Sequence, residues 1–533
     1  MMKKSNYPLN EHPHITSLKQ LVYMQAENKP NHAAFQYMLN KKIVTVTYDN
    51  FKTDIELLGT YFYSEGIRDK KIALIGENSY EWILTYFAAV IGSNIIVPID
   101  KELSESDICD LASRCNADIL IYSDVYSDIA TAAQNKNIIS KILNMNDFPL
   151  FLQKGAELLG NGFNDFINNK IDENAVCSII FTSGTTGKPK GVMLSQKNLA
   201  TDVVGSCENV YIAGSSLLTL PLHHTFAFST SVLAMMFYGV TIFINKSLRT
   251  FTKDMQTFKP QNMFVVPLYV ETMYKRIWQT AEEQGKDKLL KRIITVSNIL
   301  RKFRIDIRQK LFKSVLVGFG GNLNLIVSGG AAIDKKYIKA FDDIGILVLN
   351  GYGITECSPV VAVNRNEYYK AETVGLPLPC CDVKMVAGEI CVKGDNVMLG
   401  YYEDEEANKE AFYDEYFRTG DLGYLDNDGF LHITGRKKNL IILSNGKNVS
   451  PEELEEKILN IPNVIEAVAY GKEDIIAVDI YAENTDNIQA AITELNKTLP
   501  MYKQIQKVYF RDTEFDKTTT KKIIRRDYHA VED

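Results

Sequence analysis

The residues with the clearest chemical potential form a loop of small hydroxyl, glycine and lysine side chains. It follows the apolar run Ile179–Phe181, and its residues are Thr182, Ser183, Gly184, Thr185, Thr186, Gly187, Lys188, Pro189 and Lys190. Because glycines carry no side chain, backbone N–H groups here can approach a polyphosphate closely, while the hydroxyls and Lys190 add donors and charge. The string predicts a phosphate-binding loop; the alternative is a glycine-rich surface turn.

The spacing within this loop argues against an ordinary P-loop NTPase. That motif places Ser or Thr directly after its Gly-Lys pair, where the hydroxyl binds Mg²⁺. Here Pro189 follows Gly187 and Lys188. The phosphate chemistry must therefore belong to another class of enzyme.

Two further groups of residues carry potential chemistry. His223 and His224 follow the apolar run Leu217–Leu220 and precede Phe226; a histidine in such a setting is usually packed and hydrogen-bonded, and His223 is the weaker candidate for a function. Near the end, residues 515–526 are rich in lysine and arginine. Without other context, this stretch is typical of a solvated basic tail.

Alternating strands and helices must position these residues. The stretch 70–100 contains an apolar run, an amphipathic helix over about Tyr80–Gly92 and a second apolar run, which is a βαβ pattern. Similar apolar runs recur at Ala117–Ser123, Val176–Phe181, Leu217–Leu220, Val240–Ile244, Met263–Val266, Leu323–Ser328 and Ile346–Leu349. The sequence predicts an α/β fold with parallel or mixed sheets flanked by helices.

The pattern changes after Asp382. Short strand-like pieces at Val383–Val386 and Glu389–Val392, with a hairpin-like turn at residues 427–429, predict a β-rich subdomain over about 382–435. Beyond Gly435, a helix start at Ser450-Pro451-Glu452-Glu453 precedes two apolar strands and a helix over Asn487–Leu499. We therefore expect a body of residues 1–435 and a small α+β domain of residues 436–533.

Composition narrows the class of protein. The 533 residues are 46% hydrophobic and 23% charged, as in globular proteins that bury a sizeable core. The net charge of −7 provides no basic field for nucleic acid. The eight cysteines show no C-x-x-C pair, so we expect reduced thiols in a cytoplasmic protein, and no apolar window is long enough to span a membrane.

The phosphate loop and several later strings together resemble the motifs of the adenylate-forming superfamily, which includes acyl-CoA synthetases, carrier-protein adenylation domains and beetle luciferases. The later strings, in order, are Leu220–Phe226, Ser328–Ala332, Asn350–Glu356, Arg418–Asp421, Gly435–Asn439 and Lys517–Arg526. Their order across some 350 residues makes chance similarity negligible. The expected two-domain layout is also that of this superfamily.

The resemblance implies a nucleotide site. Tyr352 would offer an aromatic face to the purine, and Thr355 would contact the α-phosphate. Glu356, with Thr182, would hold Mg²⁺, which prefers oxygen ligands. Asp421 would accept both ribose hydroxyls, and Arg436 would donate to the sugar or phosphate. The other ATP- or AMP-binding residues implied are Gly330, Ala331, Asn350, Gly351 and Gly353.

The resemblance also assigns the chemical steps. His224 would line the junction of the acyl carboxylate and the α-phosphate. A lysine near the end would bridge these groups as the adenylate forms; alignment favours Lys522, with Lys521 as the alternative register. The small domain would then rotate about a hinge at Lys438, and Gly446 would approach the pantetheine of coenzyme A.

The substrate expected from this resemblance is a medium- to long-chain fatty acid, activated with ATP and Mg²⁺ and transferred to coenzyme A. The alternatives are loading of a carrier protein's phosphopantetheine, an aryl acid:CoA ligase, and a catalytically silent adenylate-binding scaffold. The string Gly351–Pro359 is most similar to long-chain fatty acid:CoA ligases.

One segment departs from the acidic character of the chain. Residues 286–313 hold ten lysines and arginines against Asp287 and Asp306, interleaved with apolar residues. Such a basic amphipathic segment predicts peripheral contact with the inner face of an anionic membrane. The competing interpretation, a helix packed on the body with a solvated basic face, is the more common outcome for a segment of this kind.

Overall fold

The computed structural model describes residues 7–182, 189–443, 447–472, 475–517 and 523–525. The described chain divides into two compact units. The larger unit contains Asn6–Asp382 and Lys393–Glu415, and the smaller contains Val383–Val392 and the chain from Tyr416 onward. This division reflects how compactly the chain packs and does not show where the small domain begins to move as a unit. The expected domain boundary at residue 435 therefore stays a prediction.

A seven-stranded sheet in the larger unit carries the strand that leads into the phosphate loop. Its order is β18-β8-β7-β4-β3-β5-β6. The strands are β18 (Gly400–Tyr401), β8 (Lys190–Ser195), β7 (Val176–Thr182), β4 (Ile95–Pro98), β3 (Lys71–Ile75), β5 (Ile119–Tyr122) and β6 (Lys141–Asn144). The five strands from β7 to β6 are parallel, whereas β8 and β18 join the edge antiparallel.

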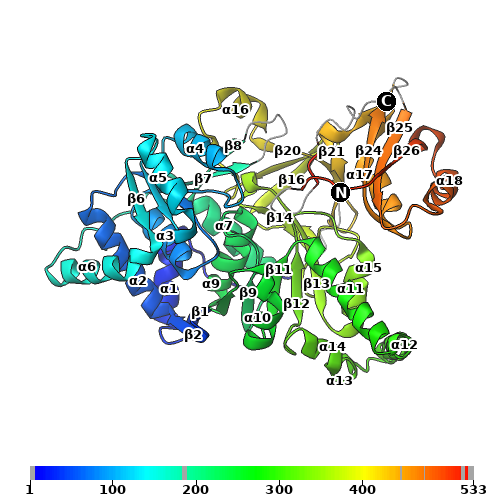
Figure 1. The fold of residues 1–533 in the computed structure, drawn as a ribbon, viewed down its shortest axis with the longest axis horizontal. Coiled ribbons are helices and arrows are strands. Elements are labelled where there is room, and N and C mark those ends of the chain that lie inside the picture. The colour runs from blue at the N-terminus through cyan, green and yellow to red at the C-terminus, as the bar shows by residue number, and fades with distance from the viewer. Residues whose placement is uncertain (1–6, 183–188, 444–446, 473–474, 518–522, 526–533) are drawn as a thin grey trace. The chain divides into compact units, whose positions relative to one another are not determined.

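Helices cover this sheet as its sequence pattern predicts. Helix α3 (Tyr80–Ile91) is buried along its whole length and packs on β3 and β4 (Figure 1). Ser79 caps it by accepting a hydrogen bond from the Trp82 N–H. Helices α4 (Glu105–Arg114) and α5 (Ser127–Asn135) add apolar side chains to the same core, which includes Ile75, Val97 and Leu120.

A nine-stranded sheet in the same unit carries the purine motif. Its order is β15-β14-β13-β12-β11-β9-β10-β1-β2. The strands are β15 (Leu376–Pro377), β14 (Val360–Val363), β13 (Leu347–Gly353), β12 (Leu325–Ser328), β11 (Asn262–Val265), β9 (Ser215–Leu218), β10 (Thr241–Ile244), β1 (Ala33–Leu39) and β2 (Lys42–Thr47). The strands from β13 to β1 are parallel, and both edges end in antiparallel strands.

The helices flanking this second sheet share one apolar core with it. Helix α15 (Lys335–Ile344) packs along β13, and α11 (Pro267–Glu283) packs on α15 (Figure 1). Buried Met263, Ile326 and Val348 of the strands meet Val270 and Phe341 of the helices. Other helices of this region include α2 (Tyr48–Ser64), α7 (Gln196–Asn209), α9 (Ala234–Tyr238), α10 (Phe251–Phe258), α12 (Asp287–Lys302), α13 (Arg308–Leu311) and α14 (Lys313–Gly318).

The smaller unit contains short antiparallel strands and an α+β module. Strand β20 (Tyr416–Leu425) pairs with both β17 (Glu389–Gly394) and β21 (Leu431–Arg436). Beyond β21, the parallel pair β25 (Ile475–Ala482) and β26 (Ile505–Arg511) joins β24 (Val464–Lys472), which runs antiparallel to β25. Helices α17 (Pro451–Ile458) and α18 (Ile488–Thr498) share the apolar core of this three-stranded sheet.

The fold class predicted from the sequence is confirmed: mixed sheets are flanked by helices, a β-rich region follows, and the chain ends in an α+β module. The turn at residues 427–429 joins β20 to β21 as a hairpin. Ser450 is the N-cap residue of α17. Within the described residues, every helix is too short or too polar to cross a bilayer.

Candidate active site

The phosphate loop joins two neighbouring antiparallel strands of the seven-stranded sheet. Thr182 ends β7, Lys190 begins β8, and the two residues are register partners. The predicted residues Ser183, Gly184, Thr185, Thr186 and Gly187 lie outside the described residues. The structure therefore places the two ends of the loop at one edge of this sheet.

The purine motif lies where β13 leaves the parallel part of the nine-stranded sheet. Gly351, Tyr352 and Gly353 pair antiparallel with β14. A Cβ atom on Gly353 would lie 2.1 Å from the carbonyl oxygen of Pro359, so only glycine fits at this position. Asn350 is buried, and its side-chain amide donates to the Thr373 carbonyl at 3.3 Å. The tyrosine ring is thus held on a rigid strand end.

Thr355 and Glu356 follow in a single turn of 3₁₀ helix, Thr355–Cys357. The hydroxyl of Tyr401 in β18 donates a hydrogen bond to Oε1 of Glu356 at 2.9 Å. Burial raises the pKa of Tyr401, and the charge and hydrogen bond of Glu356 raise it further, so the phenol stays neutral and remains a donor. The Nζ atom of Lys190 lies 4.9 Å from the centroid of the Tyr401 ring. Tyr401 thereby connects the phosphate-loop strand to the Glu356 turn.

The carboxylate of Glu356 and the hydroxyl of Thr182 are hard oxygen donors. These are the ligands that Mg²⁺ selects, together with water and nucleotide oxygens. The donor set of the described residues therefore fits the magnesium ion that the sequence implied.

Gly330 and Ala331 follow β12, the neighbour of β13. Gly330 has a positive φ of 82°, a conformation that favours glycine. Gly330 is half-buried and Ala331 is exposed. A Cβ on the preceding Gly329 would lie 2.9 Å from the ring of Phe226, so this ring packs directly on the backbone after β12.

A largely apolar cavity with about 650 Å³ of empty space adjoins the purine motif. Among the described residues, its lining has no charged side chain and consists of Ser206, Cys207, Val210, Ile212, Phe226, Thr230, Ala234, Phe264, Val327, Ser328, Gly329, Gly330, Gly351, Tyr352, Gly353, Pro359, Val360 and Val363. Its lining of apolar side chains with a few hydroxyl groups is typical of a small-molecule pocket. The stretch Gly351–Gly353, which forms the purine motif, therefore also lines the apolar cavity.

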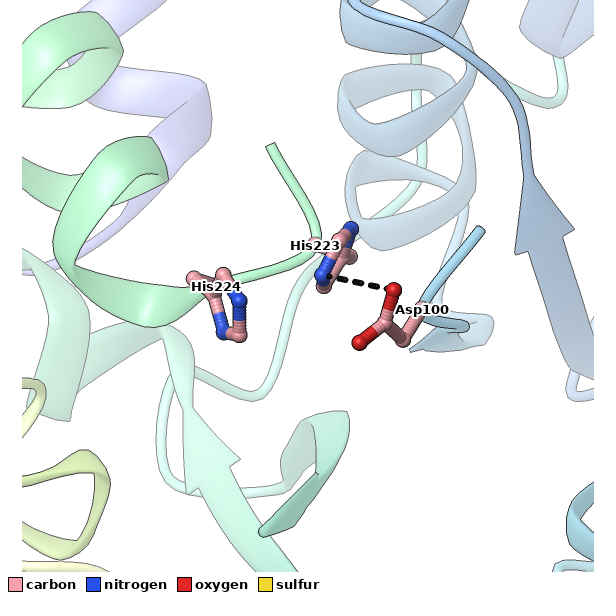
Figure 2. Close-up of side chains that lie close together, drawn as sticks. All are labelled: Asp100, His223 and His224. Atoms are coloured by element: carbon pink, nitrogen blue, oxygen red, sulfur yellow. Dashed lines mark ion pairs between the residues drawn. The ribbon is translucent and has the colours of Figure 1, made fainter. Parts of the chain in front are cut away.

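His224 stands immediately before the short helix α8 (Thr225–Phe228), between the strand β9 and that helix. Its ring lies against the ring of His223, with centroids 4.2 Å apart. The Nε2 atom of His223 lies 3.3 Å from Oδ1 of Asp100 (Figure 2). Asn78 fixes the preceding loop: its side chain donates to the Leu220 carbonyl and accepts from the Leu222 N–H.

Asp421 and Arg436 are register partners on β20 and β21 of the smaller unit. The Nε atom of Arg436 lies 2.7 Å from Oδ1 of Asp421, which is buried. The structure thus joins these two predicted residues in one ion pair.

A buried carboxylate, Glu389, braces the turn before Asp421. Its Oε1 accepts from the Gly420 N–H, and its Oε2 accepts from Arg418 and Lys437. Burial alone would raise the pKa of Glu389, but the hydrogen bonds from Lys437 and Arg418 outweigh it and hold the pKa below its usual value.

The remaining predicted residues belong to the end of the chain. Lys438 is exposed in a 3₁₀ turn directly after β21. Gly446, Lys521 and Lys522 lie outside the described residues. Their roles stay predictions.

Sequence reasoning missed Tyr401, Asp100, Asn78 and Glu389. Each of these side chains contacts a residue far away in the chain. None of them belongs to a sequence motif that indicates a catalytic or binding role. From the sequence alone, Tyr401 resembles any aromatic residue of a β-strand, and Glu389 resembles an exposed charged residue at the start of a strand. Only the pairing of strands brings these side chains to their partners.

Comparison with known proteins gives a family match over most of the chain. The model of the AMP-binding enzyme family matches residues 22–402. The chain is 27% identical to a long-chain-fatty-acid–CoA ligase, FadD15, of Mycobacterium bovis, over 87% of this chain and 81% of that protein. It is 30% identical to a 2-succinylbenzoate–CoA ligase of Bacillus cytotoxicus, over 66% of this chain and 70% of that protein.

The fold is similar to that of solved structures of known ligases. The o-succinylbenzoate CoA synthetase MenE of Bacillus subtilis, in complex with its acyl-adenylate intermediate, aligns with a TM-score of 0.76 at 21% identity. The alignment covers 96% of this chain and 98% of that one.

Proposed function

Because the chain belongs to the AMP-binding enzyme family, we propose that it is an acid–thiol ligase that converts a fatty acid to its coenzyme A thioester. ATP activates the acid to acyl-AMP with release of pyrophosphate, and the thiol of coenzyme A then displaces AMP. The observation that carries this proposal is the stretch Gly351–Gly353, which forms the purine motif and also lines the uncharged cavity. One site can thus hold a nucleotide and an apolar acyl chain next to each other.

Activation is needed because a carboxylate is a poor electrophile and oxide is a poor leaving group. In the first step, a carboxylate oxygen attacks the α-phosphorus of ATP, and the bond from that phosphorus to pyrophosphate breaks. The chain's task is to position the reactants and to balance the negative charge. Tyr352 stacks on the purine, Thr355 contacts the α-phosphate, and the phosphate loop donates N–H groups and hydroxyls to the polyphosphate.

Glu356 and Thr182 would hold the magnesium ion of the nucleotide, which would supply positive charge to neutralise the phosphates. Tyr401 fixes the orientation of the Glu356 carboxylate through its hydrogen bond to Oε1. His224 lines the position where the carboxylate meets the α-phosphate, and Asp421 and Arg436 bind the ribose.

The second step requires a different set of groups around the acyl carbon. Lys522 neutralises charge only while the adenylate forms. Residues 436–533 then reorient about Lys438, so that the segment around Gly446 meets the pantetheine arm of coenzyme A. These assignments rest on the motif resemblance alone.

A fatty acid is the acid that the cavity favours. Its lining, as far as the structure describes it, offers hydroxyls such as those of Ser206 and Thr230 but no cation to pair with a second carboxylate. The burial of an uncompensated charge there would cost several kcal/mol. The related 2-succinylbenzoate–CoA ligases act, by name, on an acid with a second carboxylate, so an aryl acid is the competing substrate.

A panel of acids tests these alternatives. Pyrophosphate release is measured with fatty acids of increasing chain length, 2-succinylbenzoate and benzoate, each with coenzyme A and with an acyl carrier protein bearing phosphopantetheine. We expect the highest kcat/KM with a medium- to long-chain fatty acid and coenzyme A. Preference for an aryl acid, or for the carrier protein, would select the corresponding alternative and refute this substrate assignment.

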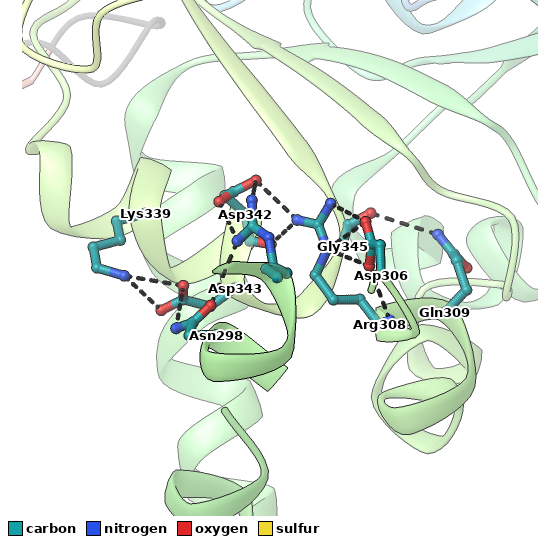
Figure 3. Close-up of polar contacts among 9 residues, drawn as sticks. Asn298, Asp306, Arg308, Gln309, Lys339, Asp342, Asp343 and Gly345 are labelled. Carbon is teal, nitrogen blue, oxygen red and sulfur yellow. Dashed lines mark hydrogen bonds and ion pairs between the residues drawn. The ribbon is translucent and has the colours of Figure 1, made fainter. Parts of the chain in front are cut away.

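We also propose that the basic segment 286–313 contacts an anionic membrane surface. Of its ten cations, Arg301 and Arg308 pair with Asp342, and Arg308 also pairs with Asp306 (Figure 3). The other eight are exposed: Lys286, Lys288, Lys291, Arg292, Lys302, Arg304, Lys310 and Lys313. The ion pairs hold α12 and α13 against α15 and leave these eight cations facing solvent.

Apolar side chains are exposed on the same segment. Phe303 is 72% exposed, and Leu289, Val296, Ile299 and Ile305 are each about half exposed. Cations together with exposed apolar side chains favour binding in the plane of a bilayer surface.

Sedimentation with vesicles of mixed neutral and anionic phospholipid tests this surface. Each cation near an anionic bilayer contributes about 1 kcal/mol, so Lys302→Glu combined with Arg304→Glu should weaken binding by at least ~10-fold. The control reverses two exposed lysines of the smaller unit, Lys457→Glu with Lys497→Glu. Equal binding by all three proteins, or no binding by the wild type, would refute the membrane contact.

A further inference from the structure

We propose that Asp100, His223 and His224 form a binding site for a divalent transition metal ion, with Zn²⁺ as its best-fitting occupant. Asp100 follows β4 of the seven-stranded sheet, and the two histidines lie between β9 of the nine-stranded sheet and α8. Within the described part of the chain, this is the group of three His, Cys, Asp or Glu side chains with metal-ligand spacing. Figure 2 shows the three side chains grouped together at the meeting of these loops.

The distances suit one small ion. One ligand atom from each side chain lies within 4.8 Å of the other two. Zinc binds imidazole nitrogen and carboxylate oxygen at about 2.0–2.2 Å, so two ligands of one tetrahedral zinc lie roughly 3.4 Å apart. The 3.3 Å between Nε2 of His223 and Oδ1 of Asp100 already matches that separation. The ligand atom of His224 lies within 4.8 Å of both, so a shift of about 1 Å brings it to the same separation.

A small cavity beside the histidines provides a second observation. It has room for about one water molecule, and both histidines line it together with Tyr86, Pro98 and Thr225 and with four apolar side chains, Ile180, Leu199, Leu222 and Phe228. Nε2 of His223 is buried and has only the Asp100 carboxylate facing it, and the hydroxyl of Thr225 is buried with no hydrogen-bond partner among the described residues. Buried polar atoms normally have partners, so the Thr225 hydroxyl indicates that a polar ligand or a water binds beside the histidines.

The ligand types distinguish this site from the magnesium site at Glu356. Two imidazoles and one carboxylate suit Zn²⁺ and similar transition metals, whereas Mg²⁺ prefers oxygen ligands and gives up its water reluctantly. Three protein ligands also leave a fourth position of a tetrahedral ion open to water or substrate.

Occupancy of this site would restrain His224. A bound ion would fix the orientation of its ring beside the acyl carboxylate and slow adenylate formation. This consequence rests on the proposed function, whereas metal binding itself does not. The two are therefore tested by separate measurements.

Metal binding is measured on the full chain by calorimetric titration with Zn²⁺ in excess Mg²⁺, and by the visible absorption spectrum of Co²⁺. We expect one Zn²⁺ per chain and a Co²⁺ spectrum typical of nitrogen ligation. Asp100→Asn and His223→Gln should each weaken Zn²⁺ binding by at least ~10-fold. His432→Gln is the matched control, because it removes a histidine whose Nε2 also faces a carboxylate, Asp426 at 3.5 Å, but which belongs to no group of three metal-ligating side chains among the described residues.

The results separate the two parts of the inference. Absence of stoichiometric Zn²⁺ binding in the wild type, or an equal affinity in Asp100→Asn and the wild type, would overturn the site. The Co²⁺ spectrum of the wild type decides the ligation even if a substitution prevents folding. Zn²⁺ should also slow pyrophosphate release in the wild type and in His432→Gln but not in Asp100→Asn; binding without inhibition would overturn the restraint on His224 alone.

Discussion

The hydrogen bond from Tyr401 to Glu356 gives the sharpest test of the site's geometry. Substitution of Tyr401 by Phe removes a single oxygen and keeps the ring that lies under Lys190. A hydrogen bond to a charged acceptor contributes about 1.5–3 kcal/mol, which corresponds to about 10- to 150-fold at 1.36 kcal/mol per factor of ten. Because Glu356 is half-buried, water can replace part of the bond, so we expect the lower end, about a 10-fold loss.

The assay is kcat/KM for magnesium-bound ATP, measured by pyrophosphate release at saturating fatty acid. If Tyr401 positions Glu356 for the ion, the loss should shrink as free Mg²⁺ is raised, because more metal compensates for a weaker ligand. Loss of structure around β18 would not respond to Mg²⁺. The Mg²⁺ series thus separates positioning from folding.

The neighbouring tyrosine provides the matched control. The hydroxyl of Tyr402 accepts a hydrogen bond from Nζ of Lys71 at 2.8 Å, so Tyr402→Phe makes the same chemical change at a different hydrogen bond. A Tyr401→Phe enzyme within about twofold of wild type would refute the role of this bond, as would an equal loss in Tyr402→Phe.

Three other predictions concern separate parts of the molecule. Lys522→Ala should abolish acyl-AMP formation and leave thioester formation from preformed acyl-AMP largely intact, whereas Lys521→Ala should retain both; loss of both steps in Lys522→Ala would contradict its role. Glu389→Gln should lower the apparent melting temperature at pH 7, because hydrogen bonds to this buried carboxylate contribute about 1–3 kcal/mol. Since the pKa of Glu389 is held below its ordinary value of 4.5, that contribution is present above about pH 4.5 and is lost as the pH falls through the lowered pKa. An equal difference between the two proteins at pH 7 and pH 3.5 would therefore contradict the assignment. Ala234→Trp, which adds a bulky side chain to the apolar cavity, should shift the preferred fatty acid to shorter chains in the acid panel; an unchanged preference would mean that the acyl chain lies elsewhere.

The sequence predicted features that local patterns encode. The apolar runs of β7, β12 and β25 and the cap of α17 depend on strand length, burial and helix-start residues close together in the chain. The division of the strands between two large sheets was not predicted, because strand pairing between distant segments leaves no local pattern.

The site shows the same limit. The stretch Gly351–Glu356 was predicted from residue types, and its placement at a strand end is a local property. The partner of Glu356 is Tyr401, 45 residues away, and the partner of His223 is Asp100, in the loop after strand β4 of the other large sheet. A sequence pattern does not reveal such contacts, because they depend on how β18 and β4 are placed in three dimensions.

Isotope transfer tests the central claim most directly. A fatty acid labelled with ¹⁸O in both carboxylate oxygens is incubated with ATP, Mg²⁺, coenzyme A and the full chain, and the products are analysed by mass spectrometry. Attack of the carboxylate on the α-phosphorus predicts one ¹⁸O atom in AMP and none in pyrophosphate. Unlabelled AMP, or ¹⁸O in orthophosphate, would contradict the account.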